Sequence, residues 1–259
     1  MNLTFLGTGT SQGVPMIGCG CRVCRSTDPH DKRLRTSAMV EVDGVTLVID
    51  AGPDFRAQML REHVKRVDAI LLTHEHTDHV GGLDDVRAFN YFMGCPMPVY
   101  AEERVLRALQ SIFAYAFGKN KYPGTPEIEQ VAIRANQPFE VRGVRVMPIR
   151  TMHAQLPVLG FRVGGLAYIT DTNLVSSASK RLMQGCEVLV INALRREQHL
   201  SHFTLAEALR LIEEVKPARA YLTHASHQLG LYAEVQPTLP PNVTLAYDGL
   251  KVAVGNAAQ

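Results

Sequence analysis

The sequence predicts an α/β protein in which two β-sheets pack face to face and helices cover their outer faces. Three observations support this fold class. Apolar strand patterns recur through both halves of the 259 residues, helical patterns interrupt them, and a hydrophobic content of 46% is enough for a sizeable core. Because no linker, repeat or low-complexity segment divides the chain, we expect a single domain over residues 1–259.

The first half of the chain alternates strand patterns with turn residues. The strands are expected at residues 1–8, 38–44, 45–52, 67–74 and 96–101. A helix is expected over residues 101–117, where Val105, Leu109 and Ile112 follow helical spacing. Its acidic residues lie at the N-terminal end, where the helix dipole favours negative charge.

The second half repeats the alternation with longer strands. They are expected at residues 129–133, 139–151, 159–172, 187–194, 218–224 and 243–255. Between the strands expected at 187–194 and 218–224, the pattern of residues 204–215 predicts a helix. Thr204 caps its N-terminus, and Glu207 completes a capping box.

Charge and hydropathy limit the classes of partner. Lys and Arg number 27 against 25 acidic residues, and the small excess is scattered, which does not favour a dedicated nucleic-acid binder. A small polyanionic substrate, a cyclic nucleotide or an RNA end is compatible with this balance. No apolar run reaches the roughly 20 residues of a membrane span, and the first residues do not resemble a secretion signal, so we expect a cytoplasmic protein without membrane contact. The sequence holds no direct evidence on a homodimer, which stays open.

The segment LLTHEHTDHVGGL, residues 71–83, concentrates imidazole and carboxylate groups in one loop after a buried strand. Neutral imidazoles and carboxylates suit divalent transition metals. The spacing allows His74 and His76 to face one ion while Asp78 and His79 face another. Two neighbouring ions lower the pKa of a shared water and stabilise the attacking and leaving oxygens of an ester under hydrolysis.

This H-x-H-x-D-H pattern resembles the signature of the metallo-β-lactamase superfamily, whose fold is an αββα four-layer sandwich. Three further residues follow apolar strands in the order that the resemblance implies, namely His153 in IRTMHA, Asp171 in YITDT and His224 in YLTHAS. By resemblance, His74, His76 and His153 hold one ion, Asp78, His79 and His224 hold the second, and Asp171 bridges the two. The ions are zinc or manganese, with iron as a further alternative, because this donor set accepts all three.

Three of the five cysteines crowd into GCGCRVC at residues 18–24. Metal ligation explains this spacing better than disulfides, and a redox cluster or unliganded thiols are the alternatives. The segment GTGTSQGVPMIGCGCRVC also resembles the N-terminus of PhnP-type phosphodiesterases, which resemble ribonuclease Z more distantly. That resemblance implies a structural zinc held by Cys19, Cys21, Cys24 and His227, in a small loop at residues 19–24. Cys95 and Cys186 stand among apolar neighbours, and we expect both to be buried.

Residues around the metal ligands receive supporting roles. The resemblance gives His202, in HLSHFT, the role of contacting phosphate or protonating the leaving group, and a surface histidine is the alternative. Asp50, in LVIDAG, is expected to orient a histidine ligand from the second shell. Asp248 is a candidate for the same supporting role, and a turn residue is an equal alternative. GTGTSQG lacks the ending of a phosphate-binding loop, so we expect a tight turn whose amides line the pocket.

Together these features predict a dinuclear metal-dependent phosphodiesterase that hydrolyses small, including cyclic, diesters through a metal-bridging hydroxide. In this reading Asp78, Asp171 and His202 form the catalytic group. The alternatives are an RNA-processing nuclease of ribonuclease Z type, a thioester or lactone hydrolase that uses the same ions on carbon, and a metal-dependent binding or carrier protein without catalysis. Aromatic and lysine residues at 87–98 and 113–124 are candidates for substrate choice or for a dimer contact.

Overall fold

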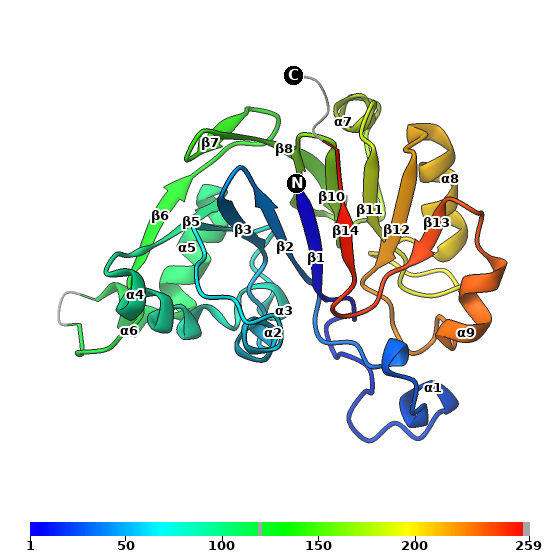
Figure 1. The fold of residues 1–259 in the computed structure, drawn as a ribbon, viewed down its shortest axis with the longest axis horizontal. Helices are drawn as coiled ribbons and strands as arrows, with labels where there is room; N and C mark the ends of the chain where they lie inside the picture. Colours follow the sequence, from blue (N-terminus) through cyan, green and yellow to red (C-terminus); the bar gives the residue numbers. More distant parts are fainter. Residues whose placement is uncertain (119–120, 256–259) are drawn as a thin grey trace.

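The computed structural model describes residues 1–118 and 121–255, in which two mixed seven-stranded sheets face each other (Figure 1). The first sheet contains, in spatial order, β14 (Lys251–Ala253), β1 (Asn2–Gly7), β2 (Ser37–Val42), β3 (Val45–Ile49), β4 (Ala69–Leu71), β5 (Met97–Ala101) and β6 (Ile128–Ala132). The second contains β13 (Val243–Leu245), β12 (Arg219–Thr223), β11 (Val188–Asn192), β10 (Leu166–Ile169), β9 (Leu156–Val163), β8 (Val144–His153) and β7 (Phe139–Val141).

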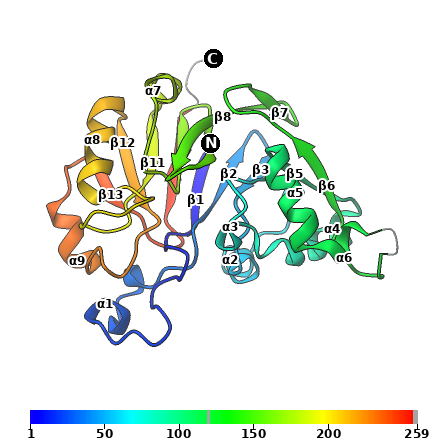
Figure 2. The same ribbon diagram turned by 180° about the vertical axis from the view of Figure 1, so that it is seen from behind.

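Helices cover the outer face of each sheet, as the views from both sides show (Figures 1 and 2). Beside the first sheet lie α2 (Phe55–Arg61), α3 (Thr77–Val80), α4 (Arg87–Met93), α5 (Glu103–Ile112) and α6 (Ala114–Phe117). Beside the second lie α7 (Ser177–Met183), α8 (Leu205–Val215) and α9 (Tyr232–Val235), while α1 (Arg22–Arg25) lies apart in the N-terminal loop. Short 3₁₀ turns occupy Pro29–Asp31, Leu83–Val86 and Gln236–Thr238. No helix among the described residues is both long and apolar enough to cross a membrane.

Three buried apolar layers explain this stacking. The central layer takes alternate residues from both sheets, such as Leu47 and Val190. A second layer lies between the first sheet and its helices and includes Phe55 and Leu109. The third lies between the second sheet and helices α7 and α8 and includes Ile191 and Leu211. Period-two burial on both faces of the strands therefore produces the four-layer αββα sandwich, and this prediction is confirmed.

Parallel pairing brings separated strand ends to one edge of the sandwich. Strands β3, β4 and β5 run parallel in the first sheet, and β10, β11, β12 and β13 run parallel in the second. Because parallel strands end at the same edge, Asp50, His74, Asp171 and His224 follow β3, β4, β10 and β12 into one region. The lower edge of the molecule in Figure 1 holds these loops.

Several elements differ from the sequence prediction. The helix expected over 101–117 is two helices, because Phe113 leaves helical geometry at φ −112° and ψ 42°. The last predicted strand, 243–255, splits into β13 and β14, which belong to different sheets. Helices α2, α4 and α7 were not expected, since each spans seven residues and shows too few turns for a clear period.

The two isolated cysteines, Cys95 and Cys186, differ in their exposure to solvent. Cys186 is buried as expected, whereas Cys95 is exposed because it lies in the short connection between α4 and β5. The expectation of a buried Cys95 is therefore wrong. The aromatic and lysine segment at 113–124 includes residues 119–120, which lie outside the described residues.

Candidate metal centre

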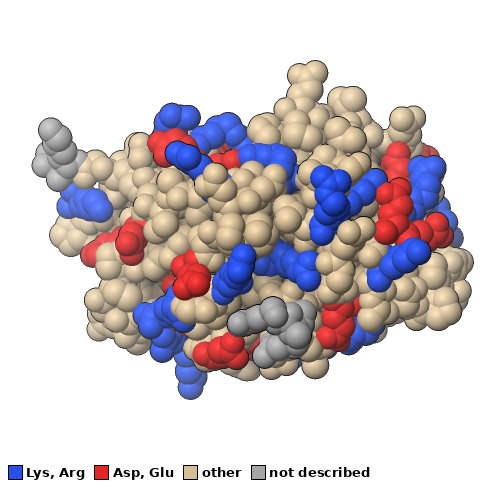
Figure 3. Space-filling model, turned by 90° about the horizontal axis from the view of Figure 1, so that it is seen from above, with Lys and Arg blue, Asp and Glu red and all other residues tan. Residues whose placement is uncertain are grey.

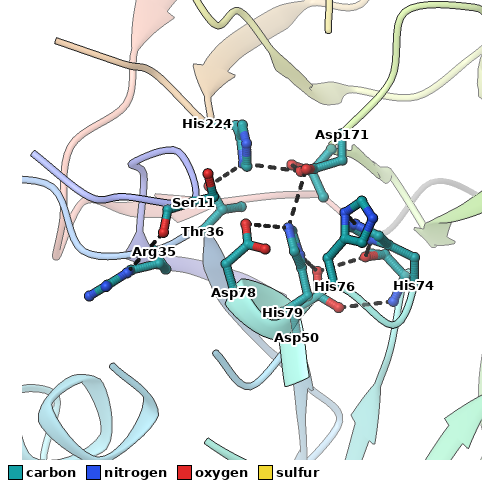
Figure 4. A network of polar contacts seen from close by, with 12 residues as sticks. Ser11, Arg35, Thr36, Asp50, His74, His76, Asp78, His79, Asp171 and His224 are labelled. Carbon is teal, nitrogen blue, oxygen red and sulfur yellow. Dashed lines mark hydrogen bonds and ion pairs between the residues drawn. The ribbon is translucent and has the colours of Figure 1, made fainter. Parts of the chain in front are cut away.

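The loop after β4 arranges two buried histidines and one exposed histidine around helix α3. His74 and His79 are fully buried, and His76 lies at the N-terminus of α3 (Figure 4). Close backbone approach fixes the loop, because a Cβ added at Gly52 would collide with the carbonyl oxygen of Asp78. A glycine is therefore required where the chain leaving β3 crosses the metal-binding loop.

Asp50 connects β3 to this loop through three hydrogen bonds. Its carboxylate accepts from the Thr73 amide at 2.9 Å, the Thr73 hydroxyl at 2.9 Å and the Nδ1 of His79 at 2.7 Å. Burial raises the pKa of Asp50, and these three donors oppose that rise. The structure thus places Asp50 against a predicted ligand, in the orienting position that the sequence analysis gave it.

Hydrogen bonding at Nδ1 turns three imidazoles so that Nε2 faces the centre. The Thr73 hydroxyl donates to Asp50, so it accepts from His74 Nδ1 at 2.9 Å. His153 Nδ1 donates to the Ser201 carbonyl at 2.8 Å, and His79 Nδ1 donates to Asp50. These bonds favour the tautomers whose Nε2 carries a lone pair that can bind a metal, and His74 Nε2 faces His76 Nδ1 at 3.0 Å.

The free nitrogens and carboxylates gather in overlapping groups whose donor atoms lie within 4.8 Å of one another. The groups are His74 with His76 and His153, His74 with His79 and Asp171, His153 with Asp171 and His202, and Asp78 with Asp171 and His224. Asp171 belongs to three of them. Its carboxylate is therefore a donor that these groups have in common.

Charge at the site fits divalent cations. Burial lowers the pKa of His74 and of His224, which keeps both imidazoles neutral and able to donate a lone pair. His79 behaves differently: although burial opposes it, Asp171, Asp50 and Asp78 raise its pKa well above the ordinary value. The carboxylates thus create a buried environment that favours positive charge, and the donor chemistry matches zinc, manganese or iron.

Three of the residues at this centre have a left-handed backbone that side chains rarely adopt. The φ angles are 62° at Asp50, 50° at Asp171 and 54° at His224, each one or two residues after the end of a parallel strand. Aspartate and histidine tolerate this region better than most residues, at a cost of about 1–3 kcal/mol each. Strain of this kind is typical of functional sites, where the surrounding fold maintains it.

His202 points into the centre. It is buried, its ring centroid lies 4.5 Å from that of His153 and 4.8 Å from that of His224, and among the described residues its Nδ1 has no hydrogen-bond partner. Burial, together with His224, lowers its pKa to about 2. The surface-histidine alternative is therefore wrong, and Asp171, which lies in the same donor group, only partly offsets this lowering of the pKa.

The N-terminal loop brings the four predicted structural-zinc ligands together. Cys19, Cys21, Cys24 and His227 form one group of donor atoms, with His227 Nδ1 at 3.5 Å from Cys19 Sγ and 3.3 Å from Cys21 Sγ. The Cys24 amide and His227 lower the pKa of Cys21 to about 6, whereas burial raises that of Cys24 to about 11. One thiolate, two further sulfurs and an imidazole fit a closed tetrahedral zinc site.

The two metal centres share one segment of chain. His224 and His227 are three residues apart, and between them Ala225 exchanges backbone hydrogen bonds with the loop after β1, donating to Thr8 at 2.9 Å and accepting from Thr10 at 3.2 Å. The turn predicted in GTGTSQG is present, because the Gly13 amide donates to the Thr10 carbonyl at 2.8 Å.

Comparison with known proteins agrees with this geometry. The family described as "Beta-lactamase superfamily domain" matches residues 46–225, which include every predicted ligand of the larger centre. The chain belongs to this superfamily. Its resemblance to the PhnP group is also confirmed: a crystal structure of a diphosphatase from the PhnP family is 40% identical, with a TM-score of 0.92, over 100% of this chain and 99% of that one.

Two other known proteins are also similar to this chain. A protein of Porphyromonas gingivalis named octanoyltransferase is 43% identical over 98% of this chain but only 52% of its own length, so the chain spans about half of that curated relative. The short form of human tRNase Z is 19% identical, with a TM-score of 0.70, over 98% of this chain and all of that one, which shows a shared fold alone.

Sequence reasoning did not identify the threonines that precede three of the ligands. Thr73 joins Asp50 and His74, and Thr170 donates to Asp171 at 2.7 Å. Thr223 holds the same position before His224, and among the described residues its hydroxyl has no partner. The signal was present in the repeated strand endings LLTH, YITD and YLTH. Ser201, which supports His153 through a backbone carbonyl, had no such signal.

Proposed function

We propose that this protein is a dinuclear metal-dependent phosphodiesterase acting on small diesters, cyclic ones included. The position of Asp171 in three overlapping groups of metal donors carries the proposal, because a shared carboxylate is what two adjacent ions need. The likeness to a superfamily member named a diphosphatase supports a hydrolase and favours phosphorus as the atom attacked.

The chain supplies the two ion sites and the groups around them. His74, His76 and His153, which form one donor group, would hold one ion. Asp78 and His224, which group with Asp171, would hold the second ion together with His79, although His79 groups with His74 and Asp171 instead. Asp171 would be a ligand of both ions. When bound, the ions supply an activated water and neutralise charge on the phosphoryl oxygens. Asp50 and the Ser201 carbonyl hold the imidazoles in the tautomer that binding requires.

His202 would position the phosphate and donate a proton to the departing oxygen. Burial lowers its pKa, so the negative charge of the bound substrate must raise that pKa and let His202 take up a proton from solvent, which it then gives to the leaving oxygen. With a good leaving group such as p-nitrophenolate, protonation matters little. His202→Ala should therefore reduce turnover of an alkyl diester more than turnover of a p-nitrophenyl diester, with metal content unchanged.

The experiment is hydrolysis of bis(p-nitrophenyl) phosphate, a p-nitrophenyl monoester, inorganic diphosphate and an octanoyl thioester by protein supplied with manganese or zinc. Asp171→Asn should abolish diester turnover, and Glu213→Gln, an exposed carboxylate on α8, is the matched control and should retain it. Diphosphate turnover alone would restrict the substrate to phosphoanhydrides. No turnover by fully metallated protein would leave the non-catalytic binding function in its place.

A second candidate is hydrolysis of acyl thioesters by the same ions. The observation that favours it is the superfamily member named octanoyltransferase, whose name refers to an eight-carbon acyl group. Turnover of the octanoyl thioester, with the diester untouched and with the same loss in Asp171→Asn, would move the attacked atom from phosphorus to carbon. The RNA-end alternative has weaker support, because a net charge of +2 does not favour strong backbone binding.

A further inference from the structure

A groove between α2 and α4 lies in the helical layer, separate from the metal ligands. Its volume is about 480 Å³. Phe55, Met59 and Phe89 are buried residues of its lining, and the rings of Phe55 and Phe89 lie 6.1 Å apart between centroids. The rest of the lining comes from both helices and their flanks and consists of Arg56, Leu60, Val64, Lys65, Asp85, Ala88 and Phe92.

Large apolar side chains remain exposed at this groove. Phe92 is 81% exposed and Leu60 is 58% exposed, although both are long enough to have packed against the core. Seven of the ten lining residues are apolar, and the volume falls within the roughly 300–1,000 Å³ of small-molecule sites. Concave apolar surface of this size marks a binding site more often than an unused surface.

The charges at the groove favour an anion. Arg56 and Lys65 both line it and are exposed, and within the described chain neither forms an ion pair nor donates a side-chain hydrogen bond. Asp85 is the single acid of the lining. Two cations against one acid give a positive potential next to apolar walls, which complements a ligand with an alkyl chain and an anionic head.

We propose that this groove binds a medium-chain carboxylate, with the alkyl chain between α2 and α4 and the carboxylate held by Arg56 and Lys65 together. A second copy of the chain is the competing occupant. A standard protein interface needs about 800 Å² on each partner, whereas this lining of ten residues has the size of a small-molecule site. This proposal goes beyond the proposed function. It does not depend on which bond the metal centre cleaves.

The first test is calorimetric titration of the metal-loaded protein with hexanoate, octanoate, decanoate and octanol. Burial of each added CH₂ should tighten binding about fourfold, or about fifteenfold per two carbons, until the groove is full. Octanol should bind more weakly than octanoate because it lacks the charge. Acetate controls for carboxylate binding at the metals, which would show no dependence on chain length.

Matched variants locate the site. Phe92→Ala should weaken octanoate binding by about tenfold, because it removes apolar contact. Lys65→Gln should also weaken octanoate binding, and octanoate should then bind no more tightly than octanol. Tyr91→Ala and Arg107→Gln alter equally exposed neighbours that do not line the groove, and both should bind as the unmodified protein does. Ala88→Trp, at an exposed position of the lining, should block the groove while diester turnover continues.

The proposal would be overturned by affinity that ignores chain length, or by Tyr91→Ala weakening binding as much as Phe92→Ala. It would equally be overturned by a concentration-dependent dimer in sedimentation that Phe92→Ala dissolves and octanoate leaves intact. That result would assign the groove to a second copy of this chain.

Discussion

Asp50 is a fully buried carboxylate that touches a predicted ligand without being one. Its carboxylate accepts a hydrogen bond from His79 Nδ1 at 2.7 Å and two more from Thr73, so its charge fixes both the ring and the strand end. Removal of such an outer partner usually costs about 10–100-fold in metal affinity or activity.

Asp50→Asn should therefore lower the affinity for the second ion by about 10–100-fold, measured by competition with a chromogenic chelator. Asp43→Asn is the matched control. Asp43 also has a positive φ, 50° compared with 62° at Asp50, but it lies in the exposed turn between β2 and β3. Equal affinities for the two variants would contradict the orienting role.

Asp248 shows how a buried carboxylate outside the metal centre links the chain ends. It accepts from the Thr8 amide at 2.9 Å, the Thr8 hydroxyl at 2.7 Å and the Leu34 amide at 2.7 Å. Burial raises its pKa from 3.8 to about 6 despite these bonds. The sequence left a turn residue and a supporting residue as equal alternatives for Asp248, and the structure shows a residue in a turn that also joins the C-terminal segment to the loops after β1.

This raised pKa gives stability a definite dependence on pH. Between about pH 4 and pH 6 the folded carboxyl holds a proton that the unfolded one has lost, so its contribution to stability falls as pH rises through this window. Asp248→Asn removes the titration. The unfolding free energy of the unmodified protein minus that of the variant should be about 1 kcal/mol larger near pH 5 than near pH 8, as urea unfolding would measure. A difference that is flat or smaller at low pH would contradict the assignment.

At the scale of elements, local patterns predicted the regular parts well. Helix α8 begins at Leu205 with the expected capping box between Thr204 and Glu207, because both partners lie within four residues of each other. The same reasoning missed the break at Phe113 and the division of 243–255, since tertiary packing decides both. The residues of β14 pair with β1, about 250 residues away in sequence, and no local pattern reports such a partner.

The loops at the strand ends depend on close backbone contact. Gly52→Ala places a Cβ against the Asp78 carbonyl, so we expect a loss of about 1–3 kcal/mol in stability and weaker binding of the second ion. Gly118→Ala is the control, because its Cβ would lie 3.5 Å from the Ala114 carbonyl oxygen, an ordinary contact. Thermal unfolding and metal titration measure both effects, and normal metal binding in Gly52→Ala would contradict this account of the loop.

The N-terminal cysteine loop is an element held by side chains more than by regular structure. Its helix α1 has four residues, and the donor group of three cysteines and His227 joins it to the segment after β12. Cys21→Ser should lose one zinc per chain and keep the ions of the larger centre, as elemental analysis would show. Cys95→Ser, at an exposed thiol outside the loop, should keep its full metal content, and unchanged zinc in Cys21→Ser would exclude a zinc site here.

Across the whole molecule, the sequence predicted the candidate site more completely than its surroundings. The ligands could be found because they follow apolar strands and repeat a dense pattern, whereas the inward turn of His202 depends on three-dimensional contacts with His153 and His224. The groove between α2 and α4 was invisible because neither helix was expected. Charge behaves as the composition indicates: the face opposite the site intermingles basic and acidic residues (Figure 3).

The central claim is that two ions, sharing Asp171, act together on a phosphodiester. The most direct measurement is diester turnover during stepwise addition of manganese or zinc to metal-free protein, with bound ions counted by native mass spectrometry. The account predicts that turnover follows the species with both ions at the larger centre and stays near background with one. Full turnover with a single ion, or none with both ions bound, would contradict it.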